Sequence, residues 1–475
     1  MHISCFLQYG REWTHIFRFL PGASHSEQSE RTSEETRKSS AATMARINGD
    51  RLWRDIMETA KWGAVPDWPG AMMRLALTDE DRLVRDWLCD EARTIGCEVI
   101  IDQMGSIFAV LPGENRKLPP IAMGSHLDTQ PAGGRFDGVL GVLAGLEVLR
   151  SVRECGIKPH ASLAVVCWTN EEGSRFVPGC TGSAVWAGHT SLRSAHARAS
   201  SCGATTLGRS STTAADHRSN PLSAYMELHI EQGPRLEAAG QTIGVVDAIQ
   251  GIRWFQVAVR GERAHSGATP MAKRADALLA ASKVVVLVAQ LSVQHGAFGT
   301  VGTLAVDNAS PNVISDCVSF SIDLRHPSEA VLSEIEEAVR EHMRALEEGD
   351  AEGRTKFAMS RVWHSPAQDF DPVLVECIQR AAATVCGTGE STQRMRSHAG
   401  HDSALVGLTG TPAAMIFVPS RNGISHAPEE WTDKEDCVAG ADTLFQAVLH
   451  YDDLLRQRTL RTEVKDGGQR PAQRL

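Results

Sequence analysis

Histidine and carboxylate residues gather in four short segments of this chain, and these residue types are the ones that hold a hydrolytic metal ion. In chain order the segments contain His126 with Asp137, Glu171 with Glu172, His229, and His426. Imidazole nitrogens and carboxylate oxygens without thiolates fit zinc, manganese or cobalt. The six residues provide five plausible ligands and one spare carboxylate. We therefore predict a site that activates water for hydrolysis.

The alternative for each residue is a structural one. The chain has 18 histidines, and a single histidine is more often a surface or hydrogen-bonded core residue than a ligand. Glu171 and Glu172 taken alone could be two solvated surface acids. Side chains of neighbours in irregular backbone diverge, so one of this pair can hold a metal while the other accepts a proton from water. Asp128 lies two residues after His126, where its carboxylate could orient that imidazole.

Three of the four segments directly follow short apolar runs that predict buried strands. The run Ser162–Trp168 is apolar throughout, which is typical of a strand covered on both faces. Residues 224–230 and 413–418 predict two more strands of the same sheet. Strands alternating with helices indicate an α/β fold with a mixed sheet and helices on both faces. Because ligands gather beyond the carboxyl ends of strands in such sheets, we expect the segments to meet at one rim.

Residues 251–362 show a different pattern, in which strands and helices follow the order β-α-β-β-α-β. This order is that of a split βαβ, or ferredoxin-like, domain. We predict a catalytic domain built from residues 44–250 and 363–458, with residues 251–362 inserted between its two parts. Residues 1–43 and 459–475 are predicted to be disordered, and Thr190–Asn220 reads as a loop or poorly packed segment.

Composition narrows the class of protein. The 475 residues are 42% hydrophobic and 22% charged, with a formal net charge of −10. An acidic chain without basic blocks argues against a nucleic-acid partner, and we find no apolar stretch long enough to cross a membrane. Eleven cysteines without a CxxC pair indicate reduced thiols and a cytoplasmic location. The alternative to a cytoplasmic location is an organelle, if residues 1–43 contain a targeting segment.

Five segments carry a family resemblance: Gly124–Leu149, Thr169–Phe176, Glu227–Glu237, Gly251–Asp276 and Met415–Thr432. They resemble the metal-dependent amidohydrolases of the M20 peptidase superfamily. The branch with N-carbamoyl-L-amino-acid hydrolases, β-ureidopropionase and allantoate amidohydrolase is the most similar. The motifs His-Ile-Glu-Gln-Gly-Pro and Ile-Ser-His-Ala-Pro-Glu-Glu-Trp are specific to that branch, and the resemblance covers roughly residues 48–455.

The resemblance implies a metallo-aminopeptidase-like catalytic domain, in which residues 251–362 act as the lid or dimerisation domain. It also implies two divalent ions per subunit, zinc, manganese or cobalt. It implies these metal ligands: Asp137 as the bridge, His126 and His229 on one ion, Glu172 and His426 on the other. It also implies that Glu171 is the general base and that His265 is a lid histidine, often supplied by the neighbouring subunit of a homodimer. Substrate contacts are implied for Asn312, Arg325, Gln232 and His401, with Arg325 suited to a carboxylate.

The implied reaction is hydrolysis of a linear C–N bond in an N-carbamoyl amino acid, which releases the amino acid, CO2 and ammonia. Allantoate is the alternative substrate, and an aminopeptidase or aminoacylase activity is a second alternative. The third alternative is a catalytically inactive protein that keeps the fold for binding or assembly. The complete set of metal ligands and the presence of Glu171 argue against it. The chain departs from the family at 190–220, and at His398, where relatives often have glycine. We expect His398 to affect substrate choice.

Overall fold

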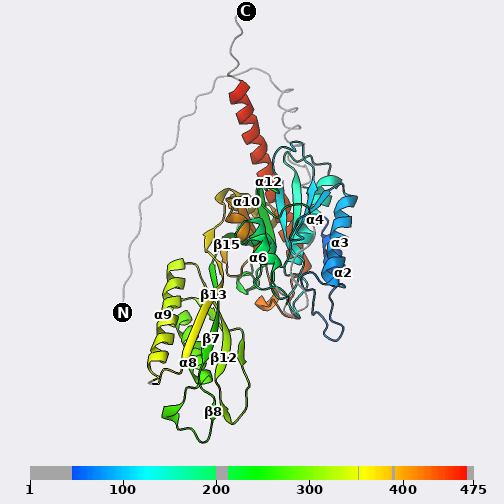
Figure 1. The fold of residues 1–475 in the computed structure, drawn as a ribbon. Helices are drawn as coiled ribbons and strands as arrows, with labels where there is room; N and C mark the ends of the chain where they lie inside the picture. Colours follow the sequence, from blue (N-terminus) through cyan, green and yellow to red (C-terminus); the bar gives the residue numbers. More distant parts are fainter. Residues whose placement is uncertain (1–44, 199, 201–211, 351, 388–390, 468–475) are drawn as a thin grey trace, which may run out of the picture. The chain divides into compact units, whose positions relative to one another are not determined.

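The computed structural model describes residues 45–198, 200, 212–350, 352–387 and 391–467 (Figure 1). The predicted extension 1–43 lies outside the described residues. The described chain builds two sheets of different size and a two-stranded ribbon. The larger sheet and its helices come from both sides of the sequence segment that forms the smaller one.

The larger sheet has nine strands in the order β1-β2-β4-β3-β5-β16-β6-β14, with β15 also paired to β6. The strands are β1 (Glu98–Ile101), β2 (Ile107–Leu111), β3 (Ile121–His126), β4 (Leu163–Trp168), β5 (Ala224–Ile230), β6 (Ile243–Ile249), β14 (Gln368–Asp369), β15 (Thr392–Ser397) and β16 (Ala413–Val418). The four central strands β4, β3, β5 and β16 are parallel. All four are buried along their whole length, as their continuous apolar runs predict.

The helices of this domain are α2 (Gly49–Thr59), α3 (Asp79–Thr94), α4 (Val139–Glu154), α5 (Thr181–Trp186), α6 (Leu192–His196), α7 (Arg235–Ala239), α10 (Pro372–Cys386), α11 (Asp402–Gly407) and α12 (Lys434–Gly467). Helices α2, α4, α10 and α12 pack in one connected group, and α4 lies against β3 and β4. Thr78 caps α3 by accepting a hydrogen bond from the backbone N–H of Asp81. The predicted α/β class is confirmed.

A buried arginine fixes the end of β4. Arg85 on α3 donates hydrogen bonds to the backbone carbonyls of Trp168 (2.9 Å) and Gly105 (3.0 Å), and its Nε lies 2.8 Å from Asp81. A buried guanidinium is tolerated when acceptors and a counter-charge surround it. Because Trp168 is the last residue of β4, Arg85 determines where the following Glu171–Glu172 segment leaves the sheet.

Residues 251–365 form the second sheet, which has five strands in the order β10-β12-β7-β13, with β9 also paired to β12. The elements of this part of the chain are β7 (Gly251–Arg260), β8 (Ala264–His265), α8 (Ala277–His295), β9 (Phe298–Thr300), β10 (Leu304–Val306), β11 (Val313–Ile314), β12 (Cys317–His326), α9 (Glu329–Glu348) and β13 (Lys356–Ser365). Strands β8 and β11 pair with each other in the separate two-stranded ribbon. Alternate residues of β7 and β12 face α8 and α9 in one apolar core. The predicted β-α-β-β-α-β order is present, with its second strand split into β9 and β10.

Helix α8 corrects the statement that the chain has no membrane-length apolar stretch. It has 19 residues with a mean hydropathy of 1.7, so length and composition alone would let it cross a membrane. Its Ala277, Ala281, Val284 and Val288 instead pack into the core of the inserted domain. The opposite face leaves Val286 and Val293 exposed.

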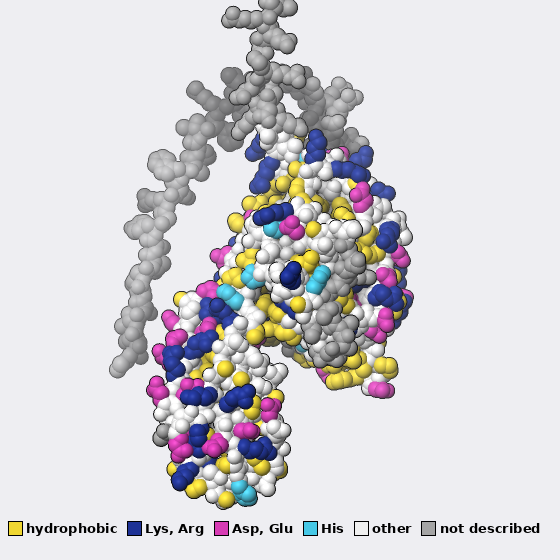
Figure 2. All heavy atoms as spheres, viewed as in Figure 1, with side chains coloured by type: hydrophobic (Ala, Val, Ile, Leu, Met, Phe, Trp, Pro, Cys, Tyr) yellow, Lys and Arg dark blue, Asp and Glu magenta, His cyan; other side chains and the backbone are white. Residues whose placement is uncertain are grey.

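The structure differs from the predictions at the C-terminal end of the folded part and in the segment 190–220. The folded part was predicted to end at residue 458, but α12 continues to Gly467. In the predicted loop 190–220, residues Leu192–His196 form α6 and Ala195 is buried; residues 199 and 201–211 lie outside the described part. On the face shown in Figure 2, acidic and basic side chains are interspersed over the described residues.

Candidate metal and catalytic site

The sheet topology brings the predicted site residues to one rim. His126 ends β3, His229 is the penultimate residue of β5, and the Glu171–Glu172 segment follows β4. Because β4, β3 and β5 are parallel neighbours, their carboxyl ends lie side by side. His426 comes from the loop after β16, which pairs with β5 in parallel. The predicted convergence is therefore confirmed.

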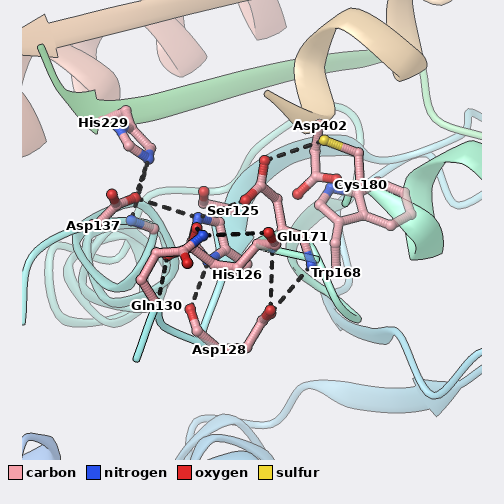
Figure 3. A network of polar contacts seen from close by, with 12 residues as sticks. Ser125, His126, Asp128, Gln130, Asp137, Trp168, Glu171, Cys180, His229 and Asp402 are labelled. Atoms are coloured by element: carbon pink, nitrogen blue, oxygen red, sulfur yellow. Dashed lines mark hydrogen bonds and ion pairs between the residues drawn. The ribbon is translucent and has the colours of Figure 1, made fainter. Parts of the chain in front are cut away.

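Asp137 lies between two groups of side chains, each able to hold one cation. One group is His126, Asp137 and His229, and the other is Asp137, Glu172 and His426; within each group one ligand atom per residue lies within 4.8 Å of the others. Asp137 Oδ1 is 3.1 Å from His229 Nε2, whereas Oδ2 is 3.1 Å from His426 Nε2. Figure 3 shows Asp137 beside His229 and His126. The two oxygens of one carboxylate thus face different groups.

Backbone carbonyls fix the two buried imidazoles. His126 Nδ1 is 2.9 Å from the carbonyl oxygen of Asp128, and His229 Nδ1 is 2.8 Å from that of Ile230. A carbonyl oxygen can only accept, so each Nδ1–H donates to it, and Nε2 is the ring atom that faces Asp137. Histidines that bind metals are held in this way.

The pKa values of Glu172 and His426 show how strongly these two side chains interact with Asp137. Burial and the charge of Asp137 raise the pKa of Glu172 to about 8. Burial opposes charging of His426, but its contacts with Asp137 and Glu172 outweigh burial and raise its pKa to about 10. Gln130 holds Glu172 with its backbone N–H (3.0 Å) and its Nε2 (2.7 Å). Both titrating groups hold a proton at neutral pH, so cation binding releases protons and becomes more favourable as pH rises.

Asp128 acts differently from the prediction. Its backbone carbonyl, not its carboxylate, orients His126. The carboxylate instead accepts the backbone N–H groups of Glu171 (3.3 Å) and Glu172 (3.2 Å). Buried Asp128 therefore links the turn after β3 to the turn after β4, and it fixes the backbone position of the two glutamates.

Glu171 lies next to the first group. Its Oε2 is 3.4 Å from His126 Nε2, and its Oε1 accepts a hydrogen bond from the Cys180 thiol at 3.1 Å. Burial raises the pKa of Glu171, the charge of His126 opposes this, and Asp128 adds to the rise. A carboxylate with a raised pKa beside a cation site is suited to accept and return a proton.

The sequence did not single out Glu430 and Ser425 as site residues. Buried Glu430 accepts the backbone N–H groups of Phe136 (3.0 Å) and Asp137 (3.1 Å), and so fixes the backbone of the shared carboxylate. Ser425 donates to Asp137 Oδ2 at 3.0 Å. The only signal was the position of both residues in the His426 segment.

A cavity of about 790 Å³ opens over these groups, lined by residues of both sheets. Gln232, Arg325 and His401, for which substrate contacts are predicted, line it. Gln232 Nε2 donates to Asp137 Oδ2 at 2.7 Å, which places this amide beside the cation groups. His401 is buried with an unpaired Nε2, and burial next to His229 lowers its pKa well below the usual range.

Arg325 is held in place on the cavity wall. Asp323 accepts from its Nε and Nη2 (2.7 Å to Nη2), and the backbone carbonyl of His398 accepts from Nη1 at 3.0 Å. The His398 ring packs against Phe298, with ring centroids 5.0 Å apart. His398 thus borders the space beside Arg325.

Four predicted site residues do not line this cavity: His126 and Asp128, which contact its lining residues, and His265 and Asn312, which lie apart from it. His265 is exposed on β8, where its Nδ1 accepts the backbone N–H groups of Gly267 and Ala268. The carbonyl of Asn312 accepts the N–H of Ser266, so both residues share the ribbon formed by β8 and β11. This chain alone does not bring them to the other site residues.

Comparison with known proteins identifies the family. The model of the peptidase family M20/M25/M40 matches residues 122–450. The chain belongs to the M20 family. It is 39% identical over 419 residues to an N-carbamoyl-L-amino-acid amidohydrolase of Rhizobium meliloti, covering 85% of this chain and 96% of the relative. It is 33% identical over 404 residues to an allantoate amidohydrolase of Bacillus subtilis, covering 81% and 93%.

A solved structure agrees with this assignment. The amidase of the hydantoinase/carbamoylase family from Burkholderia vietnamiensis superimposes with a TM-score of 0.78 at 40% identity, covering 86% of this chain and 98% of that one. The expected fold, an M20 catalytic domain with an inserted ferredoxin-like α+β domain, is confirmed.

M20 proteins are metal-dependent, and the residues present here fit metal ions. Each group offers an imidazole Nε2 and carboxylate oxygens, with no thiolate. The buried carboxyl groups of Asp128 and Asp137 and the part-buried ones of Glu171 and Glu172 lie together at one rim. Such a concentration of negative charge is stabilised by cations.

Proposed function

We propose that this M20 protein hydrolyses the linear C–N bond of N-carbamoyl amino acids and releases the amino acid, CO2 and ammonia. The observation that carries the proposal is one cavity holding the shared Asp137, the base candidate Glu171 and the fixed Arg325. The N-carbamoyl-L-amino-acid amidohydrolase relatives support it. Allantoate is the second candidate substrate, favoured by the B. subtilis relative.

The proposed cofactor is a pair of divalent ions, zinc, manganese or cobalt. His126 and His229 would hold one, Glu172 and His426 the other, and Asp137 both. When bound, the ions activate water and polarise the scissile carbonyl.

The chain's own residues supply the proton transfer and the orientation. Glu171 accepts the proton of the attacking water and later returns it to the leaving nitrogen, so the base is regenerated. Arg325 forms a charge-assisted pair with the substrate carboxylate. Gln232 and His401 bind the ureido end. The second product, carbamic acid, then breaks down to CO2 and ammonia.

A substrate panel tests the proposal. Ammonia release is measured with N-carbamoyl-L-amino acids, N-carbamoyl-β-alanine and allantoate, and release of free amino acids is measured with dipeptides, each with manganese or zinc added. Faster turnover of carbamoyl amino acids supports the proposal, whereas faster allantoate turnover selects the second candidate. Faster dipeptide hydrolysis would assign a peptidase, and no turnover of any ureido compound would refute both ureido assignments.

Arg325 provides a prediction about substrate charge. Arg325→Met should raise KM for N-carbamoyl amino acids about 30-fold, because charge-assisted hydrogen bonds contribute roughly 2 kcal/mol. The corresponding neutral amide should bind wild type and variant alike. Arg344→Met, which removes an exposed arginine on α9, is the matched control. An unchanged KM for the acid would exclude Arg325 as its anchor.

We also propose a homodimer formed through the inserted domain. The outer face of α8 exposes Val286 and Val293, and Leu304 is exposed on the edge strand β10. Exposed apolar faces and strand edges are typical of protein interfaces. In such a dimer, His265 and Asn312 would act in the partner's cavity rather than in their own.

Subunit complementation tests this arrangement. His265→Ala and Glu171→Gln should each be inactive as separate preparations. After mixing and exchange, random pairing should restore about a quarter of wild-type activity, because each mixed dimer contains one intact site. Val286→Asp with Val293→Asp should give monomers by analytical ultracentrifugation. Mixed preparations that stay inactive, despite proven exchange, would refute a shared site.

A further inference from the structure

A thiol contacts the carboxylate that we assign as the base. Cys180 Sγ lies 3.1 Å from Glu171 Oε1, and Figure 3 shows the sulfur directed at this carboxylate. Cys180 is 3% exposed and lines the cavity. The other carboxylate oxygen, Oε2, is directed at His126. The thiol therefore occupies one side of the carboxylate while the opposite side faces the cation groups.

Backbone contacts also hold the Gly179–Cys180 segment close to Glu171. The Cys180 N–H donates to the Glu171 carbonyl at 2.7 Å. A Cβ on Gly179 would lie 2.2 Å from that carbonyl oxygen, so only glycine allows the approach. Cys180 precedes α5 without capping it through its side chain. Its thiol is thus free to bond the carboxylate instead of the helix end.

The chemistry of the thiol suits an acidic surrounding. Asp128, Asp137, Glu172 and Asp402 all lie near Glu171. A lysine or arginine at this position would supply a competing charge to a cation site. An S–H group is a weak, neutral donor, which can fix the direction of a carboxylate without neutralising it.

The backbone of Cys180 is strained for a residue with a side chain. Its φ is 48° and its ψ is 33°, in the left-handed region that glycine adopts freely. Non-glycine residues in this region are concentrated at functional sites. Glycine would remove the strain but would also remove the donor.

We propose that Cys180 is a positioning residue, whose thiol holds Glu171 so that Oε2 faces the attacking water. The inference rests on the proposed role of Glu171 as the base. Misdirection of this carboxylate lowers the rate of proton transfer, while the residues that bind substrate are unaffected.

A set of Cys180 variants of the full-length, metal-loaded protein tests the inference on the carbamoyl compound that wild type hydrolyses. Cys180→Ala should lower kcat about three- to tenfold, the value of one hydrogen bond, with KM unchanged. Cys180→Ser keeps a donor and should restore kcat to within about twofold. Cys180→Gly should lose kcat as Ala does, while its thermal midpoint is unchanged or raised.

Two further measurements separate positioning from packing. In the Glu171→Gln background, Cys180→Ala should have no additional effect, because the side chain that the thiol directs can no longer accept the proton. Cys377→Ala removes a buried thiol on α10 away from the cavity and should leave kcat unchanged. Metal content should equal that of wild type in every Cys180 variant.

Different results would overturn the role of Cys180 and the proposed hydrolysis. Wild-type kcat in Cys180→Ala, or an equal loss in Cys180→Ser, would overturn it while hydrolysis itself stands. An equal effect of Cys180→Ala with and without Glu171 would overturn it as well. A wild-type protein inactive on every ureido compound would instead refute the proposed function.

Discussion

Glu171→Gln is expected to lower kcat by about 10³-fold or more, because the amide cannot accept the proton of the attacking water. The substitution keeps the size of the side chain. The contact of Oε1 with Cys180 and the hydrogen bond from the backbone N–H to Asp128 should survive. KM should therefore change little. Ammonia release under saturating substrate measures the effect.

The control for this prediction is the neighbouring glutamate. Glu172→Gln should also lower activity, but through loss of the ion that Glu172, Asp137 and His426 would hold. Metal analysis separates the two variants, since Glu171→Gln should keep the wild-type metal content. Activity within tenfold of wild type in Glu171→Gln would show that another group accepts the proton.

Local sequence patterns predicted the sheet well because the central strands are buried on both faces. The run ending at Trp168 can satisfy its apolar side chains only between two layers, so its assignment needed no tertiary information. The convergence of His126 and His229 followed from the same topology. Parallel neighbours place their carboxyl ends together whatever their separation in the chain.

The residues that support the site were harder to predict. Glu430 bonds backbone N–H groups 293 and 294 positions away, and nothing around it in sequence indicates those partners. Asp128 was correctly associated with His126, but the choice between its carbonyl and its carboxylate depends on the turn geometry. Cys180 looks like any small residue before a short helix until Glu171 is placed beside it.

The limits of α8 and α12 show where propensity is insufficient. The sequence pattern of residues 273–291 predicts the first helix of the inserted domain, but Asp276 caps this helix and it starts at Ala277. Helix α12 extends beyond the last predicted residue, because its polar C-terminal turns carry no apolar pattern to mark them. In both cases the error lies at an end, where packing contributes least.

Asp137→Asn is expected to remove metal from both groups, whereas a variant of any other ligand should affect one. Its two carboxylate oxygens face His229 and His426 separately, and an amide offers one oxygen and no charge. Activity should fall at least about 10³-fold, as for loss of the metal-activated nucleophile. His229→Ala and His426→Ala are the matched controls, each removing one imidazole from one group.

Metal stoichiometry and thermal unfolding together decide this prediction. Wild type should unfold at a higher temperature with added manganese or zinc than after chelation, because a cation that binds only the folded chain stabilises it. Asp137→Asn should show no such dependence, and each histidine variant should retain part of it. Because contacts with His229, His126 and His426 hold the pKa of Asp137 well below its usual range, Asp137→Asn without metal should be less stable than the chelated wild type at neutral pH. Full metal content in Asp137→Asn would mean that the two groups bind independently, and Asp137 would then not be the shared ligand.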